Sequence, residues 1–203
     1  MRMVRPRVTG VIQAGGRSVR MGGRPKALLE LGGRRIIERV LAAIEGLVDD
    51  VLVVTNTPEA YAFLGVPMVG DVYPGGGSLG GIFTGLQAAG GEAAFTVACD
   101  MPFLQPDVVR LVLDRAGEGD VVIPRVGGQL ETMHAVYRKT CLPAMEACLR
   151  AGRLKIVAFF DAVRVVEIPE AEIARVADPA LAFMNVNTPE ELERARALLP
   201  AVR

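Results

Sequence analysis

The residues best suited to chemistry lie in a glycine-rich, cationic segment near the amino end. This segment, AGGRSVRMGGRPK at residues 14–26, contains four glycines and the cations Arg17, Arg20 and Lys26. Glycines let backbone N–H groups approach a ligand where a side chain would block them, and the cations neutralise an anion. Since Ala27 follows Lys26, the segment is not a P-loop of the form G-x-x-x-x-G-K-[ST]. It predicts a phosphate-binding loop of another type.

A carboxylate that could bind a metal ion stands in CDMP, directly after the apolar run AAFTVA. Mg²⁺ carried by a polyphosphate takes one or two carboxylates together with phosphate oxygens. We therefore expect Asp100 to be a metal ligand. The alternative is a turn aspartate that hydrogen-bonds its own backbone.

Two asparagines alternate in the segment FMNVNTPEE. Asn185 and Asn187 should point the same way, because alternate residues of an extended segment share a face. They could bind a substrate hydroxyl or a water of the metal and phosphate. The alternative is that they are turn and helix-entry residues.

A second glycine-rich stretch, DVYPGGGSLGGIFTGL at residues 71–86, predicts a loop followed by a helix with glycines in its first turn. Each such glycine costs about 1 kcal/mol of helix propensity relative to alanine, which indicates that something packs closely there. A flat nucleotide base would fit. Close packing of the helix on a sheet is the alternative.

The elements that must position these residues follow from an alternation of apolar runs and helical patterns. Strands are predicted at 8–13, 51–55, 94–98, 121–124, 134–137 and 163–168. Helices are predicted at 36–45, 58–64, 80–89, 106–116, 142–151 and 189–199, the last with a capping box from Thr188 to Glu191. The alternation is typical of an α/β fold with a three-layer, doubly wound and mostly parallel sheet. In such sheets ligands bind beyond the carboxyl ends of the strands, where the polar segments fall.

Length and composition limit the function classes. The 203 residues, 51% of them hydrophobic, predict a single domain, residues 1–203. A formal net charge of zero argues against nucleic-acid and membrane-surface binding. Three cysteines without C-x-x-C spacing suggest neither a disulfide framework nor a zinc site, which favours the reducing cytoplasm. No signal peptide or membrane span is expected.

Four motifs in this order and spacing carry a family resemblance: AGGRSVRMGG-x-x-K, GGGSLGGIFTGL, CDMPFLQPD and FMNVNTPEEL. Together they resemble the molybdenum cofactor guanylyltransferases, the MobA family, over most of the chain. The opening loop and the strand-end aspartate are shared by the wider nucleotidyltransferase superfamily, whose fold is Rossmann-like. The ending NVNTPEEL together with CDMP is more specific.

The resemblance implies a role for each matching residue. Arg20, Lys26 and Asp100 match catalytic positions, with Asp100 as the magnesium ligand. The implied nucleotide-binding set is Gln13, Ala14, Gly15, Gly16, Lys26, Asn56 (or its neighbour Thr55), Asp71, Gly77, Gly81 and Asp100. The implied acceptor-binding set is Asn185, Asn187 and Lys155. The chain departs from the family at Gln13, Pro25 and Ser78, where leucine, aspartate and proline are usual.

The implied reaction transfers GMP from GTP to the phosphate of molybdopterin, with Mg²⁺ as cofactor and pyrophosphate as the second product. The acceptor phosphate is already anionic near pH 7, so no general base is needed. We therefore expect His134, the only histidine, to be structural. The resemblance also implies contact with proteins that mature molybdenum enzymes. Two alternatives stay open: a related transferase that uses CTP or another nucleotide, and a nucleotide-binding module without catalysis.

Overall fold

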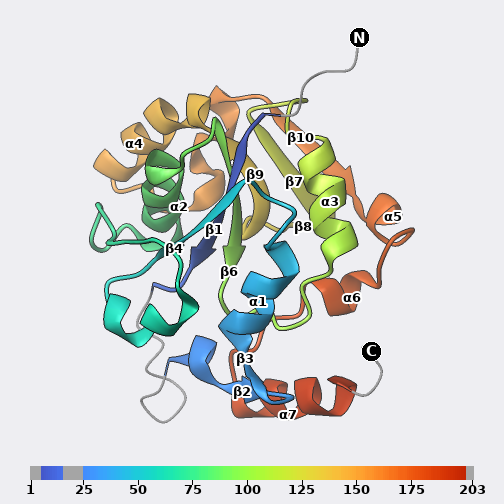
Figure 1. The fold of residues 1–203 in the computed structure, drawn as a ribbon. Helices are drawn as coiled ribbons and strands as arrows, with labels where there is room; N and C mark the ends of the chain where they lie inside the picture. The colour runs from blue at the N-terminus through green and yellow to red at the C-terminus, as the bar shows by residue number, and fades with distance from the viewer. Residues whose placement is uncertain (1–5, 16–24, 200–203) are drawn as a thin grey trace.

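The computed structural model describes residues 6–15 and 25–199, and an eight-stranded sheet runs through them (Figure 1). The strand order is β10-β7-β9-β6-β1-β4-β5, with β8 paired to β7. The strands are β1 Val8–Gln13, β4 Asp50–Val54, β5 Met68–Val69, β6 Ala93–Ala98, β7 Val121–Val126, β8 Gln129–Leu130, β9 His134–Arg138 and β10 Val165–Pro169. The predicted mostly parallel α/β sheet is confirmed.

β9, in the middle of the sheet, and the short β8 run against the other strands. β9 is antiparallel to both β6 and β7, whereas β1 is parallel to both β4 and β6. The alternation pattern placed this strand among parallel ones. Between β7 and β9 lie only residues 127–133, which are too few for the crossover that a parallel strand needs. The chain therefore returns in the opposite direction.

Helices cover both faces of the sheet, which gives three layers (Figure 1). Helices α1 (Ile36–Ile44) and α3 (Pro106–Asp114) pack on one face, and α2 (Gly77–Ala88) and α4 (Leu142–Arg150) pack on the other. Successive strand side chains point to opposite faces. In β1, Ile12 accordingly belongs to the core beneath α1, and Val11 to the core beneath α2.

A smaller cluster closes one end of the molecule. The hairpin of β2 (Glu30–Leu31) and β3 (Arg34–Arg35) lies beside α7 (Pro189–Leu198), beyond the end of the sheet (Figure 1). Thr188 and Glu191 cap α7 through the predicted reciprocal hydrogen bonds. Short helices α5 (Glu170–Ile173) and α6 (Pro179–Ala182) pack on the face of the sheet that α1 and α3 cover, and a 3-10 turn spans Lys26–Leu28.

The helix predicted at 58–64 is wrong. The chain forms two separate 3-10 turns there, Pro58–Ala60 and Ala62–Leu64. Gly65 follows in the left-handed conformation, with φ of 66°, and ends the segment. A helix this short gains too few hydrogen bonds to offset the cost of its first turn.

The glycines of α2 bring this helix close to the sheet. A Cβ atom on Gly85 would lie 2.3 Å from Cγ1 of Val11, and one on Gly81 would lie 2.6 Å from Oε1 of Gln13. Packing of α2 on β1, the alternative considered for this stretch, therefore explains Gly85.

Among the described residues, no helix combines the length and apolar composition needed to cross a bilayer.

Candidate functional site

A cleft of about 760 Å³ opens where β1 and β4 end and α2 begins. Seven of the predicted nucleotide-binding residues line it: Gln13, Ala14, Gly15, Asn56, Asp71, Gly77 and Gly81. These residues come from segments up to about 70 positions apart, so the fold brings together what the sequence motifs suggested. The cleft lies at the carboxyl ends of parallel strands, as expected for this class of sheet.

Neighbouring strands fix the end of β1 from both sides. The amide of Ala14 donates to the carbonyl of Val54 at 2.9 Å, and the amide of Cys99 donates to the carbonyl of Gln13 at 3.2 Å. The first bond ties β1 to the cleft wall formed by β4, and the second ties it to the segment that carries Asp100. The end of β1 therefore lies between these two groups of residues.

Asp71 is held rigidly at the cleft wall. Its Oδ1 accepts hydrogen bonds from the Tyr73 amide at 3.0 Å and from the Thr84 hydroxyl at 3.1 Å. Its own amide donates to Oδ1 of Asn56 at 2.8 Å. Thr55 lines the cleft as well, but its hydroxyl accepts from the amide of Thr57. Asn56 is thus the member of this pair that orders the aspartate.

Sequence reasoning missed several cleft residues. Val54, Thr57, Pro74, Gly75 and Ser78 also line the cleft. Of these five residues, only Ser78 stood out in the sequence, because the family usually has proline at this position. The role of Thr84 in holding Asp71 had no signal beyond a hydroxyl within an apolar helix.

A second group, the Lys26–Asp100 cluster, consists of Lys26, Asp100, Asn187 and Glu191. Nζ of Lys26 donates to Oδ1 of Asn187 at 2.7 Å. The carbonyl of Asp100 accepts from the Val186 amide at 2.9 Å, which brings the loop before α7 against the end of β6. Glu191 accepts from the amide of Asn187, so the α7 capping box also orders this asparagine.

The hydrogen bonds of this cluster bring its charged members near one another, and this proximity affects the pKa of Asp100. Burial raises the pKa of the half-buried Asp100 carboxyl above its usual value. The positive charge of Lys26 opposes this rise, and the negative charge of Glu191 adds to it. The predicted proximity of Lys26 and Asp100 is therefore found. A carboxylate in this setting gains from a cation that enters with a substrate.

The donor set suits an ion that arrives with phosphate. Within residues 6–15 and 25–199, no group of three or more His, Cys, Asp or Glu side chains is arranged to hold a metal ion. A fully protein-built cage is therefore not found in this part of the chain. Mg²⁺ bound to a nucleotide needs only one or two protein carboxylates, because phosphate oxygens and water supply the remaining ligands. Asp100 fits that requirement.

Other predicted residues have different surroundings. The side-chain amide of Asn185 donates to the carbonyl of Phe183 at 3.3 Å, whereas the side-chain oxygen of Asn187 accepts from Lys26. The two asparagines therefore have different partners. Lys155 is exposed in the segment after α4 and is not part of the cleft lining. Gly16 and Arg20 lie outside the described residues.

His134 lies in the core. It is fully buried at the start of β9, with its ring centroid 5.2 Å from that of Phe95 and 4.8 Å from that of Phe183. Neither ring nitrogen has a hydrogen-bond partner among the residues that the structure describes. Burial lowers the pKa of His134 to about 3, so the ring is neutral at physiological pH. The expectation of a structural histidine agrees with this environment.

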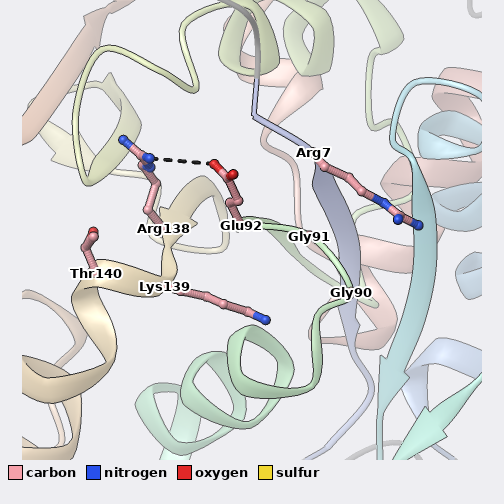
Figure 2. A pocket seen from close by; sticks show the side chains of 7 residues that line it. All are labelled: Arg7, Gly90, Gly91, Glu92, Arg138, Lys139 and Thr140. Carbon is pink, nitrogen blue, oxygen red and sulfur yellow. Dashed lines mark ion pairs between the residues drawn. The ribbon is translucent and has the colours of Figure 1, made fainter.

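A second cleft, of about 570 Å³, lies at the opposite end of the sheet, before β1 and β6 begin and after β9 ends (Figure 2). Its three cations have partners within the chain. Arg7 points away from the others and pairs with Asp50 at 3.0 Å, while Arg138 faces Glu92 at 3.8 Å (Figure 2). Lys139 donates to the carbonyl of Ala89 at 2.6 Å. All three cations of this second cleft therefore interact with groups of the chain itself.

Comparison with known proteins gives the same family over most of the chain. Residues 10–165 match the profile of a family described as MobA-like NTP transferase domain. A probable molybdenum cofactor guanylyltransferase of Pelotomaculum thermopropionicum is 41% identical, over 94% of this chain and 92% of its own. A molybdenum cofactor guanylyltransferase of Desulfosudis oleivorans is 40% identical, over 97% and 98%. The crystal structure of molybdopterin-guanine dinucleotide biosynthesis protein A from Archaeoglobus fulgidus is similar with a TM-score of 0.81 and 25% identity, and the match covers 95% of this chain and 99% of that one.

Proposed function

The chain belongs to the family of MobA-like NTP transferases, and on this premise we propose that it transfers GMP from GTP to the phosphate of molybdopterin. The observation that carries the proposal is the arrangement at the end of β1. The cleft lies on one side of this strand end, and the Lys26–Asp100 cluster lies next to the strand on its other side.

The two groups of residues suit the two ends of a nucleoside triphosphate. The cleft supplies polar groups with fixed positions, Asn56 and Asp71, together with glycines that leave room for a flat ring. The cluster supplies one ammonium group and a carboxylate suited to a divalent ion. We therefore place the nucleoside in the cleft and the triphosphate at Lys26 and Asp100.

The reaction needs charge neutralisation more than proton transfer. A phosphate monoester is largely a dianion at neutral pH, so the acceptor attacks the α-phosphorus without a general base. Lys26 stabilises the negative charge that moves onto the departing pyrophosphate. Asp100 would hold Mg²⁺, and the ion would supply positive charge that neutralises phosphate oxygens. Asn187 orients the ammonium group of Lys26.

The acceptor side is built around the loop before α7. Asn187 lies beside Lys26, and Asn185 is two residues away, so we place the molybdopterin phosphate against this loop. An acceptor role for Lys155 and contact with proteins that mature molybdenum enzymes stay predictions.

Cys99, Cys141 and Cys148 are free thiols, which suits the reducing cytoplasm.

Pyrophosphate release tests the proposal. The purified chain is incubated with Mg²⁺, molybdopterin and either GTP, CTP, ATP or UTP, and pyrophosphate is measured together with the mass of the product. We expect release with GTP that requires both the acceptor and Mg²⁺, and a product larger by GMP. Preferential release with CTP would show instead a related transferase of other specificity. Binding of GTP without any release would indicate a nucleotide-binding module.

A further inference from the structure

Gln13 carries a buried amide nitrogen for which the described residues supply no hydrogen-bond acceptor. The residue is 9% exposed, and within residues 6–15 and 25–199 Nε2 has no hydrogen-bond partner. A buried donor without an acceptor is costly and rare, so it calls for an explanation. Gln13 also lines the cleft, where leucine is usual in the family that the chain resembles.

The surroundings of Gln13 make space for this amide. Gln13 is the last residue of β1 and follows the alternation that directs Val11 toward α2. Its Oε1 lies where a Cβ atom on residue 81 would be 2.6 Å away, so only a glycine at Gly81 admits the side chain in this position. The amide therefore lies between the end of β1 and the first turns of α2, beside the cleft.

We expect the base of the nucleotide on the face of the sheet that α2 covers. Lys26 begins the 3-10 turn whose Ala27 is buried in the core beneath α1, and Asp100 lies near Lys26. The phosphate-binding groups thus belong to the α1 side of the strand end, whereas Gln13 faces α2. The cleft is lined by the first turns of α2, so we place the base of a nucleotide held at Lys26 on this side.

We propose that Gln13 recognises the guanine base by donating a hydrogen bond from Nε2 to the keto oxygen at position 6 of the ring. This rests on the function proposed above. Guanine offers an acceptor at that position, whereas adenine offers an amino group, which would leave the amide donor unpaired. Bound guanine would therefore give Nε2 the acceptor that it lacks in the free chain.

The test compares GTP with 6-thio-GTP, in which a weakly accepting sulfur replaces the keto oxygen. Dissociation constants are measured by calorimetry in Mg²⁺ for the unmodified chain, for Gln13→Leu and for the control Gln87→Leu, which makes the same change at an exposed residue of α2 outside the cleft. We expect the unmodified chain and Gln87→Leu to prefer GTP by about tenfold, and Gln13→Leu to prefer it by about twofold or less. Gln13→Leu removes an unpaired buried donor, so its ligand-free melting temperature should not fall.

Two results would overturn the inference. One is an unchanged preference in Gln13→Leu, and the other is an equal loss of affinity for both nucleotides, which would indicate a contact elsewhere on the ligand. In either case transfer of GMP by the unmodified chain would leave the proposed function standing. An unmodified chain that binds neither nucleotide would contradict the proposed function itself, and this inference with it.

Discussion

Nζ of Lys26 donates a hydrogen bond of 2.7 Å to Oδ1 of Asn187, a residue 161 positions further along the chain. The bond joins the end of the glycine-rich loop to the loop before α7. Both partners are polar and accessible, so the bond contributes little to folding stability. Its consequence is positional, because it directs the one ammonium group of the Lys26–Asp100 cluster.

Replacing the asparagine should therefore affect catalysis more than stability. Asn187→Ala frees the ammonium group of Lys26, and we expect kcat/KM for GTP to fall about tenfold while the melting temperature changes little. Lys26→Ala removes the charge itself and should cost about 100-fold or more. Steady-state kinetics and thermal unfolding of both variants provide the check. A strongly destabilised Asn187→Ala with normal kinetics would contradict this role.

Asp100→Asn should abolish most turnover and leave the fold intact. The change keeps the size of the side chain but removes the negative charge that holds Mg²⁺, so kcat should fall about 100-fold or more. Rates measured over a range of Mg²⁺ concentrations, with circular dichroism as the control for folding, test this expectation. If Asp100→Asn matches the unmodified enzyme at every Mg²⁺ concentration, the metal assignment is wrong.

His134 should make the fold sensitive to acid. Burial lowers its pKa to about 3 in the folded chain, whereas a solvent-exposed histidine has a pKa of 6.5. Below pH 6.5 the unfolded state therefore binds a proton that the folded state does not, and stability falls as the pH decreases toward 3. At about pH 5 this effect amounts to about 2 kcal/mol. It is absent above the unfolded pKa.

Denaturant unfolding at about pH 5 and about pH 8 measures this effect. His134→Leu cannot titrate, so it should lose about 2 kcal/mol less between the two pH values than the unmodified chain. Phe183→Leu, which loosens the same ring cluster without changing a charge, is the control and should lose as much as the unmodified chain. Identical pH dependence in His134→Leu would exclude the histidine as the source.

Gly85 sets how closely α2 approaches the sheet. Gly85→Ala would place a Cβ atom 2.3 Å from Cγ1 of Val11, so we expect a loss of about 1–3 kcal/mol in the free energy of unfolding. Val11→Ala removes the obstructing methyl groups. In the double variant the two losses should therefore be less than additive by about 1 kcal/mol, measured by chemical denaturation. Strict additivity would show that the two positions do not contact one another.

The long strands and helices could be predicted because their local patterns agree with the fold. β1 was predicted with its exact bounds, and the capping box at Thr188 and Glu191 was predicted from residue types alone. The reversed direction of β9 could not be seen in its apolar pattern, since a strand buried on both faces has the same composition whichever way it runs. Short elements such as β5 depend on pairing with neighbours far away in the sequence.

The candidate site was predictable in its membership and less so in its arrangement. The family resemblance carried by the motifs identified seven of the thirteen residues that line the cleft, which lies at the carboxyl ends of parallel strands. Contacts between distant residues, such as Thr84 with Asp71, had no local signal. The unpaired amide of Gln13 appears only once Gly81 is placed beside it.

The proposed position of the nucleotide can be checked in a crystal structure of the chain with Mg²⁺ and a GTP analogue that cannot be cleaved between the α- and β-phosphates. We expect the guanine in the cleft between Gln13 and Asn56, with the β- and γ-phosphates at Lys26 and the ion at Asp100. A nucleotide bound instead beside Arg138 and Lys139, at the opposite end of the sheet, would contradict it.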